Sequence, residues 1–291
     1  MKEIVVVSGK GGTGKTSVTA SFSYLGGASV ITADCDVDAA DMHLLLKPDF
    51  EYSEDFYSGE ISSIDQSACI RCGKCAEVCR FDAITVKDGV YRIDPLRCEG
   101  CGYCSRVCPA EAIVNKERLA GKWHISNIRT GGKMVHARLG IGADNSGKLV
   151  ARVKNEAREL ALEERADYVI VDGSPGVGCP VVSSLSGANF VILVTEPTVS
   201  GLHDLKRVYE LVKKFHIKAG CIINKADINP EQHQAILNFL AEEDIPHLTD
   251  LPYDGQFTQA ITTGKTVAES GSVRLKELLS ACWEKVKKLT I

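Results

Sequence analysis

The chain has 291 residues, of which 44% are hydrophobic and 25% are charged. This composition is ordinary for a globular protein and excludes a disordered or fibrous chain. Its 34 Lys and Arg against 38 Asp and Glu give a formal charge of −4, so we expect no nucleic-acid partner. No apolar run reaches the roughly 18 residues of a membrane span, so we expect a cytoplasmic protein whose 12 Cys do not form disulfides.

The N-terminal residues predict a strand, a glycine-rich turn and a helix. Residues 4–8 form a mostly apolar run typical of a buried strand, and a helical pattern begins at Ser17. Between them, glycines let backbone N–H groups converge on phosphate oxygens at a helix N-terminus. We expect Lys15 to reach the β- and γ-phosphates and the Thr16 hydroxyl to bind Mg²⁺. The residues expected to bind nucleotide here are Gly9, Gly11, Gly12, Thr13, Gly14, Lys15, Thr16 and Ser17.

Later apolar runs predict a sheet. The expected buried strands are residues 29–33, 168–172, 190–195 and 221–224. Helical patterns follow the last two, at residues 201–215 and 231–243. This alternation predicts the α/β class, with a doubly wound, mostly parallel sheet that binds its ligand at the carboxyl ends of the strands.

Eight cysteines lie in two tandem runs with the spacing C-x2-C-x2-C-x3-C. The runs are Cys69, Cys72, Cys75, Cys79 and Cys98, Cys101, Cys104, Cys108. They resemble the bacterial two-cluster ferredoxins, in which the fourth thiolate of each run reaches the other cluster. The resemblance implies two [4Fe-4S] clusters, one on Cys69, Cys72, Cys75 and Cys108 and the other on Cys98, Cys101, Cys104 and Cys79. C-x2-C pairs also bind zinc, but two complete runs in tandem favour iron–sulfur clusters.

The glycine-rich turn also carries an extra lysine, Lys10, in the form K-G-G-T-G-K-T. This resembles the deviant Walker A motif of the SIMIBI P-loop ATPases, the class that holds MinD, ParA, the Mrp-type carriers and the nitrogenase iron protein. In that class the first lysine contacts the nucleotide of the partner subunit. The resemblance therefore implies an ATP-dependent homodimer in which Lys10 and Lys15 are catalytic.

The same resemblance assigns roles to residues at the ends of predicted strands. It implies that Asp36 orients the attacking water and that Asp172, as in Walker B, accepts from Mg²⁺-bound water. Asp34 and Asp38 are weaker candidates for the Mg²⁺ shell. It also implies that Asn224 contacts adenine and that Pro252 lies in a loop beside the base.

The cysteine runs interrupt the ATPase pattern between Asp36 and Asp172. The whole chain resembles MinD-superfamily ATPases that contain an inserted ferredoxin domain. By this resemblance residues 1–59 and 119–291 form the P-loop ATPase domain, and residues 60–118 form a small α+β ferredoxin domain. Residues 119–145 predict a hairpin stretch, and Asn145-Ser146 predicts the start of the next helix.

Three features leave alternatives open. Asn224-Lys225-Ala226-Asp227 spells N-K-x-D, which reads guanine in GTPases, although Lys10 favours ATP. Cys179 is either an ordinary packed cysteine or half of a two-thiolate site between subunits; Ala143, in a loop that resembles a cluster-ligand loop of the nitrogenase iron protein, argues against a bridging cluster. The amphipathic C-terminal helix is either a closing helix packed on the sheet or a membrane tail, and the first is favoured.

These features predict an ATP-hydrolysing homodimer with Mg²⁺ and two [4Fe-4S] clusters. Nucleotide state would control electron transfer to a redox or metallocofactor protein, or cluster assembly on it. A metallochaperone would need a labile metal site, for which Cys179 is the candidate. The alternative is a ParA/MinD-like spatial organiser in which the ferredoxin serves as a sensor or docking module.

Overall fold

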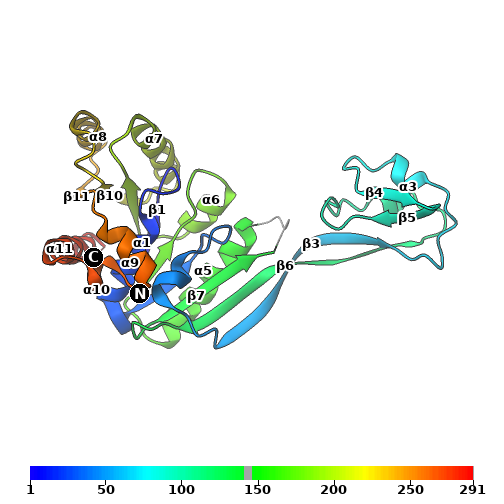
Figure 1. The fold of residues 1–291 in the computed structure, drawn as a ribbon, viewed down its shortest axis with the longest axis horizontal. Helices are drawn as coiled ribbons and strands as arrows, with labels where there is room; N and C mark the ends of the chain where they lie inside the picture. The colour runs from blue at the N-terminus through cyan, green and yellow to red at the C-terminus, as the bar shows by residue number, and fades with distance from the viewer. Residues whose placement is uncertain (141–145, 291) are drawn as a thin grey trace. The chain divides into compact units, whose positions relative to one another are not determined.

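The computed structural model describes residues 1–140 and 146–290, which belong to two compact units (Figure 1). The first unit contains Met1–Glu54, Trp123–Arg138 and the chain from Ser146 onward. The second contains Asp55–Lys122. The cysteine runs therefore lie in a unit of their own, inserted into the first.

The main sheet has the strand order β11-β10-β9-β1-β8-β2-β7-β6-β3, and parts of β3 and β6 belong to the second unit. Its parallel centre pairs β1 with β8 and β9, β2 with β7 and β8, and β10 with β9 and β11. The bounds are β1 Lys2–Val7, β2 Val30–Asp34, β3 Tyr52–Ile64, β6 Ile113–Asn127, β7 Lys133–Leu139, β8 Tyr168–Asp172, β9 Phe190–Thr195, β10 Lys218–Asn224 and β11 His247–Leu251. The predicted mostly parallel α/β sheet is confirmed, with β3, β6 and β7 extending one edge.

Helices cover this sheet, and several begin at side-chain caps. Thr198 accepts from the Gly201 N–H at the start of α7, and Asn229 accepts from the Gln232 N–H at the start of α8. The helices predicted at residues 201–215 and 231–243 are thus confirmed. The bounds are α1 Lys15–Gly26, α2 Met42–Leu46, α5 Ser146–Glu163, α6 Cys179–Leu185, α7 Val199–Lys214, α8 Pro230–Glu242, α9 Gln256–Thr263, α10 Val267–Ser270, α11 Val273–Leu289 and the 3₁₀ turn η1 Gly27–Ser29.

The predicted hairpin stretch is observed as β6 and β7. A tight turn joins these strands, in which the Ile128 N–H donates to the Gly132 carbonyl at 3.0 Å. The part of the expectation that concerns residues 141–145, including Ala143 and Asn145, lies outside the described residues. The next helix, α5, begins at Ser146.

The second unit contains two short helices and a small antiparallel hairpin. The helices are α3 (Lys74–Glu77) and α4 (Tyr103–Arg106), and the strands are β4 (Ile84–Lys87) and β5 (Val90–Ile93). Each helix follows a glycine with a positive φ, Gly73 at 81° and Gly102 at 67°. Because these glycines occupy equivalent places in the two cysteine runs, the sequence repeat is also a structural repeat.

The C-terminal helix α11 packs on the core of the first unit, as the favoured interpretation predicted. Its Leu275, Leu279 and Val286 are buried, and the Trp283 ring stacks on Phe22 with centroids 5.4 Å apart. The apolar face of α11 therefore lies against protein. No helix within residues 1–140 and 146–290 is long and apolar enough to cross a membrane.

Removing the Trp283 ring tests how much this closing helix contributes. Trp283 is 3% exposed, so Trp283→Ala should lower the free energy of unfolding by about 3–5 kcal/mol, because a large cavity opens against Phe22. Glu277→Ala, on the exposed side of α11, should change it by less than about 0.5 kcal/mol. Urea unfolding followed by far-ultraviolet circular dichroism measures the free energy of unfolding of both variants. This signal reports secondary structure and does not depend on Trp283 fluorescence. Equal effects would contradict a packed α11.

Candidate functional site

The glycine-rich turn lies between β1 and α1, at the carboxyl ends of the parallel strands. Gly14 caps α1 with a φ of 92°, and a Cβ built on it would lie 2.4 Å from Asn224 Nδ2. Only glycine fits both the left-handed backbone and this close approach. The N-terminus of α1 therefore opens toward the ligand side of the sheet, where backbone N–H groups can meet an anion.

Lys15 is buried at the centre of this site among carboxylates. Its Nζ lies 2.8 Å from Asp172 Oδ2 and 3.5 Å from Asp36 Oδ2. Burial alone would lower the pKa of Lys15, but the neighbouring carboxylates of Asp172 and Asp36 raise it above its ordinary value. Lys15 therefore carries a fixed positive charge at the strand ends, as a phosphate-binding lysine requires.

Burial also changes the pKa values of the carboxylates around Lys15. Burial raises the pKa of Asp36, and the Lys15 ammonium opposes that shift. Asp34 is fully buried beside Asp172, its neighbour in the β2–β8 pairing, and burial together with the Asp172 charge raises its pKa well above the ordinary value. A divalent cation at this point would relieve the repulsion between these groups.

Two hydroxyls complete the surroundings of Asp172. Thr16 Oγ1 donates to Asp172 Oδ2 at 2.7 Å, and Thr19 Oγ1 donates to Asp172 Oδ1 at 2.8 Å. Thr16 lines the cavity described next, whereas Thr19 is fully buried beneath it. Thr16 and Asp172, predicted to serve Mg²⁺, are thus adjacent on the ligand side.

A cavity of about 360 Å³ opens beside these groups. Apolar residues of α2 and α9, including Leu44, Leu45 and Ile261, form one wall and were not predicted as site residues. Gly9 and Thr13 lie outside the lining, and Gly9 sits against the Asp204 backbone instead. The predicted residues that line the cavity are Gly11, Gly12, Gly14, Lys15, Thr16, Ser17 and Asp36.

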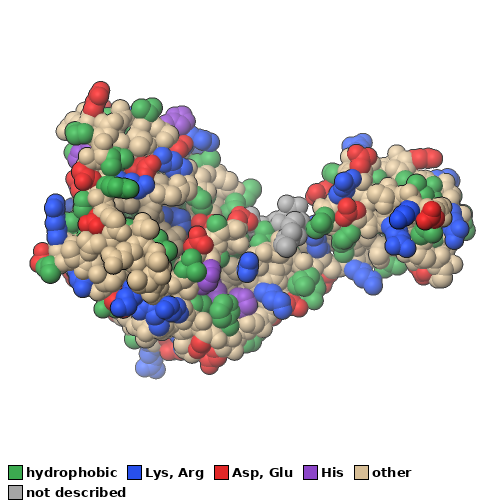
Figure 2. Space-filling view, in the orientation of Figure 1, with side chains coloured by type: hydrophobic (Ala, Val, Ile, Leu, Met, Phe, Trp, Pro, Cys, Tyr) green, Lys and Arg blue, Asp and Glu red, His purple; other side chains and the backbone are tan. Residues whose placement is uncertain are grey.

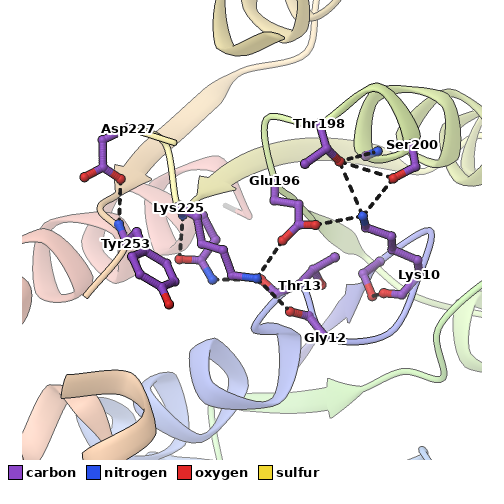
Figure 3. A network of polar contacts seen from close by, with 12 residues as sticks. Lys10, Gly12, Thr13, Glu196, Thr198, Ser200, Lys225, Asp227 and Tyr253 are labelled. Carbon is purple, nitrogen blue, oxygen red and sulfur yellow. Dashed lines mark hydrogen bonds and ion pairs between the residues drawn. The ribbon is translucent and has the colours of Figure 1, made fainter. Parts of the chain in front are cut away.

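Lys10 belongs to a polar network of its own chain, together with Glu196, Thr198 and Ser200 (Figure 3). Its Nζ lies 2.7 Å from Glu196 Oε1 and donates to Ser200 Oγ at 2.9 Å. The second oxygen of Glu196 lies 2.7 Å from Lys225 Nζ, so one carboxylate binds two lysines, and these lysines lower its pKa against the effect of burial. Sequence reasoning missed Glu196, although a charged residue directly after the apolar run of β9 was a usable signal.

Asn224 and Lys225 of the N-K-x-D segment contact the backbone of the glycine-rich turn. Asn224 Nδ2 donates to the Thr13 carbonyl at 2.8 Å, and Lys225 Nζ donates to the Gly12 carbonyl at 3.3 Å (Figure 3). Asp227 accepts from the Tyr253 N–H at 2.7 Å, directly after Pro252 at the end of β11. The segments that contain Asn224 and Pro252 therefore meet, while the base contacts expected of these two residues stay predictions.

The eight clustered cysteines line two separate cavities of the second unit. One cavity is lined by Cys69, Cys72, Cys75 and Cys108. The other is lined by Cys79, Cys98, Cys101 and Cys104. This is the crossed grouping that the ferredoxin resemblance implies, with the last cysteine of each run beside the other run.

The cysteine cavities suit a cluster better than a single ion. Among the described residues, no group of three or more His, Cys, Asp or Glu converges closely enough to hold one metal ion. Four thiols placed around a space fit a [4Fe-4S] cube, which presents four separate irons, whereas zinc draws its ligands to one point. Each cavity would hold one cube, and the cube would supply one-electron redox chemistry.

The four remaining cysteines differ in environment. Cys35, Cys221 and Cys282 are buried, as expected for core positions, and burial raises the pKa of Cys282 to about 12. Cys179 is exposed at the start of α6, so the favoured expectation that it is packed is wrong. Its exposure adds no second ligand, and the two-thiolate site stays a prediction.

His136 is one of the histidines without metal-ligand spacing, and its surroundings indicate a structural role. It is buried in β7, and its Nε2 lies 2.9 Å from Ser126 Oγ. Burial, with a smaller contribution from His124, lowers the pKa of His136 to about 3. His136 is therefore neutral at physiological pH and packs as part of the sheet.

Comparison with known proteins identifies relatives of both units. Residues 62–115 match the family described as 4Fe-4S dicluster domain. Along the whole chain, the uncharacterized protein MJ0578 of Methanocaldococcus jannaschii is 34% identical over 288 residues, covering 98% of this chain and 96% of that protein. The uncharacterized protein MJ0579 of the same organism is 26% identical over 277 residues, covering 94% of each.

Solved structures share the fold of the first unit. The septum site-determining protein MinD of Pyrococcus horikoshii, complexed with Mg-ADP, aligns with a TM-score of 0.59 at 22% identity, covering 99% of this chain and 96% of that one. The McdA(D38A)–ATP complex of Cyanothece aligns with a TM-score of 0.60 at 14% identity, covering 99% and 96%. The fold is therefore that of the MinD/ParA P-loop ATPases.

Paired cysteine substitutions test the crossed cavities. Cys75→Ser/Cys108→Ser changes two cysteines of one cavity and should lower the iron content from about eight to about four per chain. Cys104→Ser/Cys108→Ser changes two cysteines of one run but of different cavities, and should lower it further. Anaerobic iron and sulfide analysis measures this. The reverse order of iron loss would assign each run to its own cluster and overturn the crossed sets.

Two threonines that bind the same carboxylate give a test for the metal position. Thr16→Ala should abolish the Mg²⁺-dependent part of nucleotide affinity, because it removes the hydroxyl that faces the cavity. Thr19→Ala should keep the Mg²⁺ dependence and lower stability by about 1 kcal/mol, because it removes only a buried hydrogen bond. Calorimetric titration of ATP with Mg²⁺ and with a chelator compares them. Full Mg²⁺ dependence in Thr16→Ala would place the ion elsewhere.

Proposed function

Because the chain belongs to the family of M. jannaschii MJ0578 and has a MinD/ParA-type P-loop ATPase fold with an inserted 4Fe-4S dicluster domain, we propose that it is an ATP-gated homodimer that hydrolyses ATP. The observation that carries this proposal is the arrangement of Lys15, Asp36 and Asp172 at the N-terminus of α1. Lys15 Nζ lies 2.8 Å from Asp172 Oδ2 and 3.5 Å from Asp36 Oδ2, beside a cavity large enough for a nucleotide.

The chemistry follows from the position of each group. Lys15 and the backbone N–H groups of the turn hold the phosphates, and Thr16 with Asp172 holds Mg²⁺. Asp36 lines the cavity and accepts a hydrogen bond from the attacking water, which orients it toward the γ-phosphate. Its raised pKa makes it a better proton acceptor than an ordinary aspartate.

Lys10 makes formation of the homodimer depend on bound nucleotide. Its contacts with Glu196 and Ser200 hold it against its own chain, and reaching the nucleotide of a second subunit requires their exchange for phosphate oxygens. Glu196 keeps Lys225 as a partner when Lys10 leaves, so its charge stays paired. The exchange is therefore favourable only when a nucleotide in the partner provides the new contacts.

The process that the nucleotide state controls takes place at the two cysteine cavities. With a [4Fe-4S] cluster in each, the inserted unit passes electrons to a partner protein, or assists cluster assembly on it. Electron transfer needs only the eight cysteines that line the cavities. A metallochaperone needs a further labile site, and the exposed Cys179 offers a single thiol.

Support for the spatial-organiser alternative is weaker. A membrane tail would need an apolar helical face that is free to bind lipid, and the buried face of α11 packs against Phe22 and Tyr168. The ATPase fold by itself fits either function. The cysteine cavities favour the redox function, because eight ligands are more than a docking module requires.

A conservative change at Asp36 tests hydrolysis separately from binding. Asp36→Asn should lower ATP hydrolysis by at least about 100-fold while ATP-dependent dimerisation is kept, because the amide cannot accept the proton of water. Asp167→Asn, an exposed position directly before β8 and at the opposite end of that strand from Asp172, should hydrolyse ATP close to the wild-type rate. Phosphate release and light scattering with ATP measure both effects.

The same assay distinguishes the open alternatives for the nucleotide. Parallel reactions with GTP should be much slower than with ATP. A strong preference for GTP would overturn the adenine assignment of Asn224, and a chain that stays monomeric with ATP would overturn the role of Lys10.

A further inference from the structure

The two cysteine cavities are similar in ligands but differ in charge. The lining of the first contains one charged residue, Arg71, and the lining of the second contains one, Glu99. Both lie in the short loop that carries the second cysteine of the run, which is Cys72 in one and Cys101 in the other. The lining of the first cavity is therefore positive relative to the lining of the second, although Arg118 donates to the Cys98 carbonyl at 3.5 Å from outside the second lining.

The loop over the first cavity also has the features of a small docking surface. Ile70 is 65% exposed and lies beside the exposed Cys72. Arg71 and Lys74 flank that cysteine, both exposed, and neither has an ion-pair partner within the described part of the chain. An apolar side chain with unpaired cations around it, directly over a cysteine cavity, matches the core and rim of a transient protein interface.

The charged side chains of the inserted unit balance one another overall. Between residues 60 and 118, Lys and Arg are as numerous as Asp and Glu. Figure 2 shows basic, acidic and hydrophobic side chains interspersed over the surface of this unit. Before the charge of the clusters is counted, the side chains of the unit are therefore balanced, and the orientation of a charged partner depends on the local charge beside each cavity.

We propose that the loop 70–74 is the docking surface for a small acidic one-electron carrier protein, which exchanges electrons with the cluster in the first cavity. This rests on the proposed redox function of the inserted unit. One electron passes from the reduced carrier, which becomes oxidised, to the oxidised cluster, which becomes reduced. No bond is formed or broken and no proton is transferred.

Electrostatics decide why this loop serves an acidic carrier. A cluster held by four thiolates is negatively charged and repels an acidic protein. Arg71 and Lys74 offset that charge at the first cavity, whereas Glu99 adds to it at the second. Redox encounters bury little area, so two lysine- or arginine-type contacts are a large part of the steering.

Charge reversal at the loop tests the proposal, with a control of equal net charge. Arg71→Glu/Lys74→Glu should slow reduction of the holoprotein by a reduced acidic 2[4Fe-4S] ferredoxin at least about tenfold at low salt. Lys87→Glu/Arg92→Glu makes the same change in charge on exposed positions of β4 and β5 that belong to neither cavity lining, and should keep most of the rate. Anaerobic stopped-flow absorbance measures the second-order rates.

Three further readouts keep the outcome decisive. Iron content and visible absorption verify that both variants hold their clusters. The wild-type rate should fall as salt rises, and the two double variants should converge at about 0.5 M salt, where charges are screened within a few ångströms. A wild-type rate that rises with salt, or equal slowing in both variants, would overturn the docking surface.

The same experiment separates failure of the docking surface from failure of the redox function. If dithionite reduces the clusters but substitution of Arg71 and Lys74 leaves the rate of reduction by ferredoxin unchanged, only the proposed docking surface is wrong. If no reductant reduces them, the proposed redox function fails. Concentration-dependent self-association that Arg71→Glu abolishes would show that the loop binds a second copy of this chain in place of the carrier, and would overturn the proposal.

Discussion

One buried ammonium group, that of Lys15, makes the ligand end of the sheet possible. Asp34 and Asp172 end adjacent strands in register, and Asp36 follows within two residues, so three carboxylates lie close together at the C-terminal edge of β2 and β8. Burying such charges without compensation is costly. The Lys15 ammonium, held by the turn before α1, offsets them, and the local backbone depends on it.

The same pairing explains how the site can respond to a nucleotide. Lys15 and Thr16 already bind Asp172, and Lys10 already binds Glu196, so each group that would hold a phosphate or Mg²⁺ has a protein partner of suitable charge. Ligand binding is then an exchange of partners and not the filling of unsatisfied positions. An exchange costs little in total charge but moves Lys10 relative to α7, which begins directly beyond Glu196.

Features that depend on neighbouring residues could be predicted from the sequence, and features that depend on distant ones could not. The cysteine runs and the glycine-rich turn are local patterns, and the buried central strands are apolar runs. β3 carries polar residues on much of both faces and gave no comparable signal, and β6 was predicted only from residue 119 onward, as part of a hairpin stretch. The pairing of Lys10 with Glu196 joins residues far apart in the chain, and the exposure of Cys179 is set by the packing of α6.

The repeat itself shows how packing limits which cysteine loop can vary. Gly100 in the second run has a φ of 64°, and a Cβ built there would lie 2.1 Å from the Glu60 carbonyl of β3, so a larger residue is excluded. Arg71 occupies the equivalent place in the first run with nearly the same φ, 59°, and is exposed. Contact with β3 therefore restricts the second loop to glycine, while the first loop can carry a long charged side chain beside its cavity. The lack of a charged side chain at the place of Gly100 therefore follows from where β3 packs.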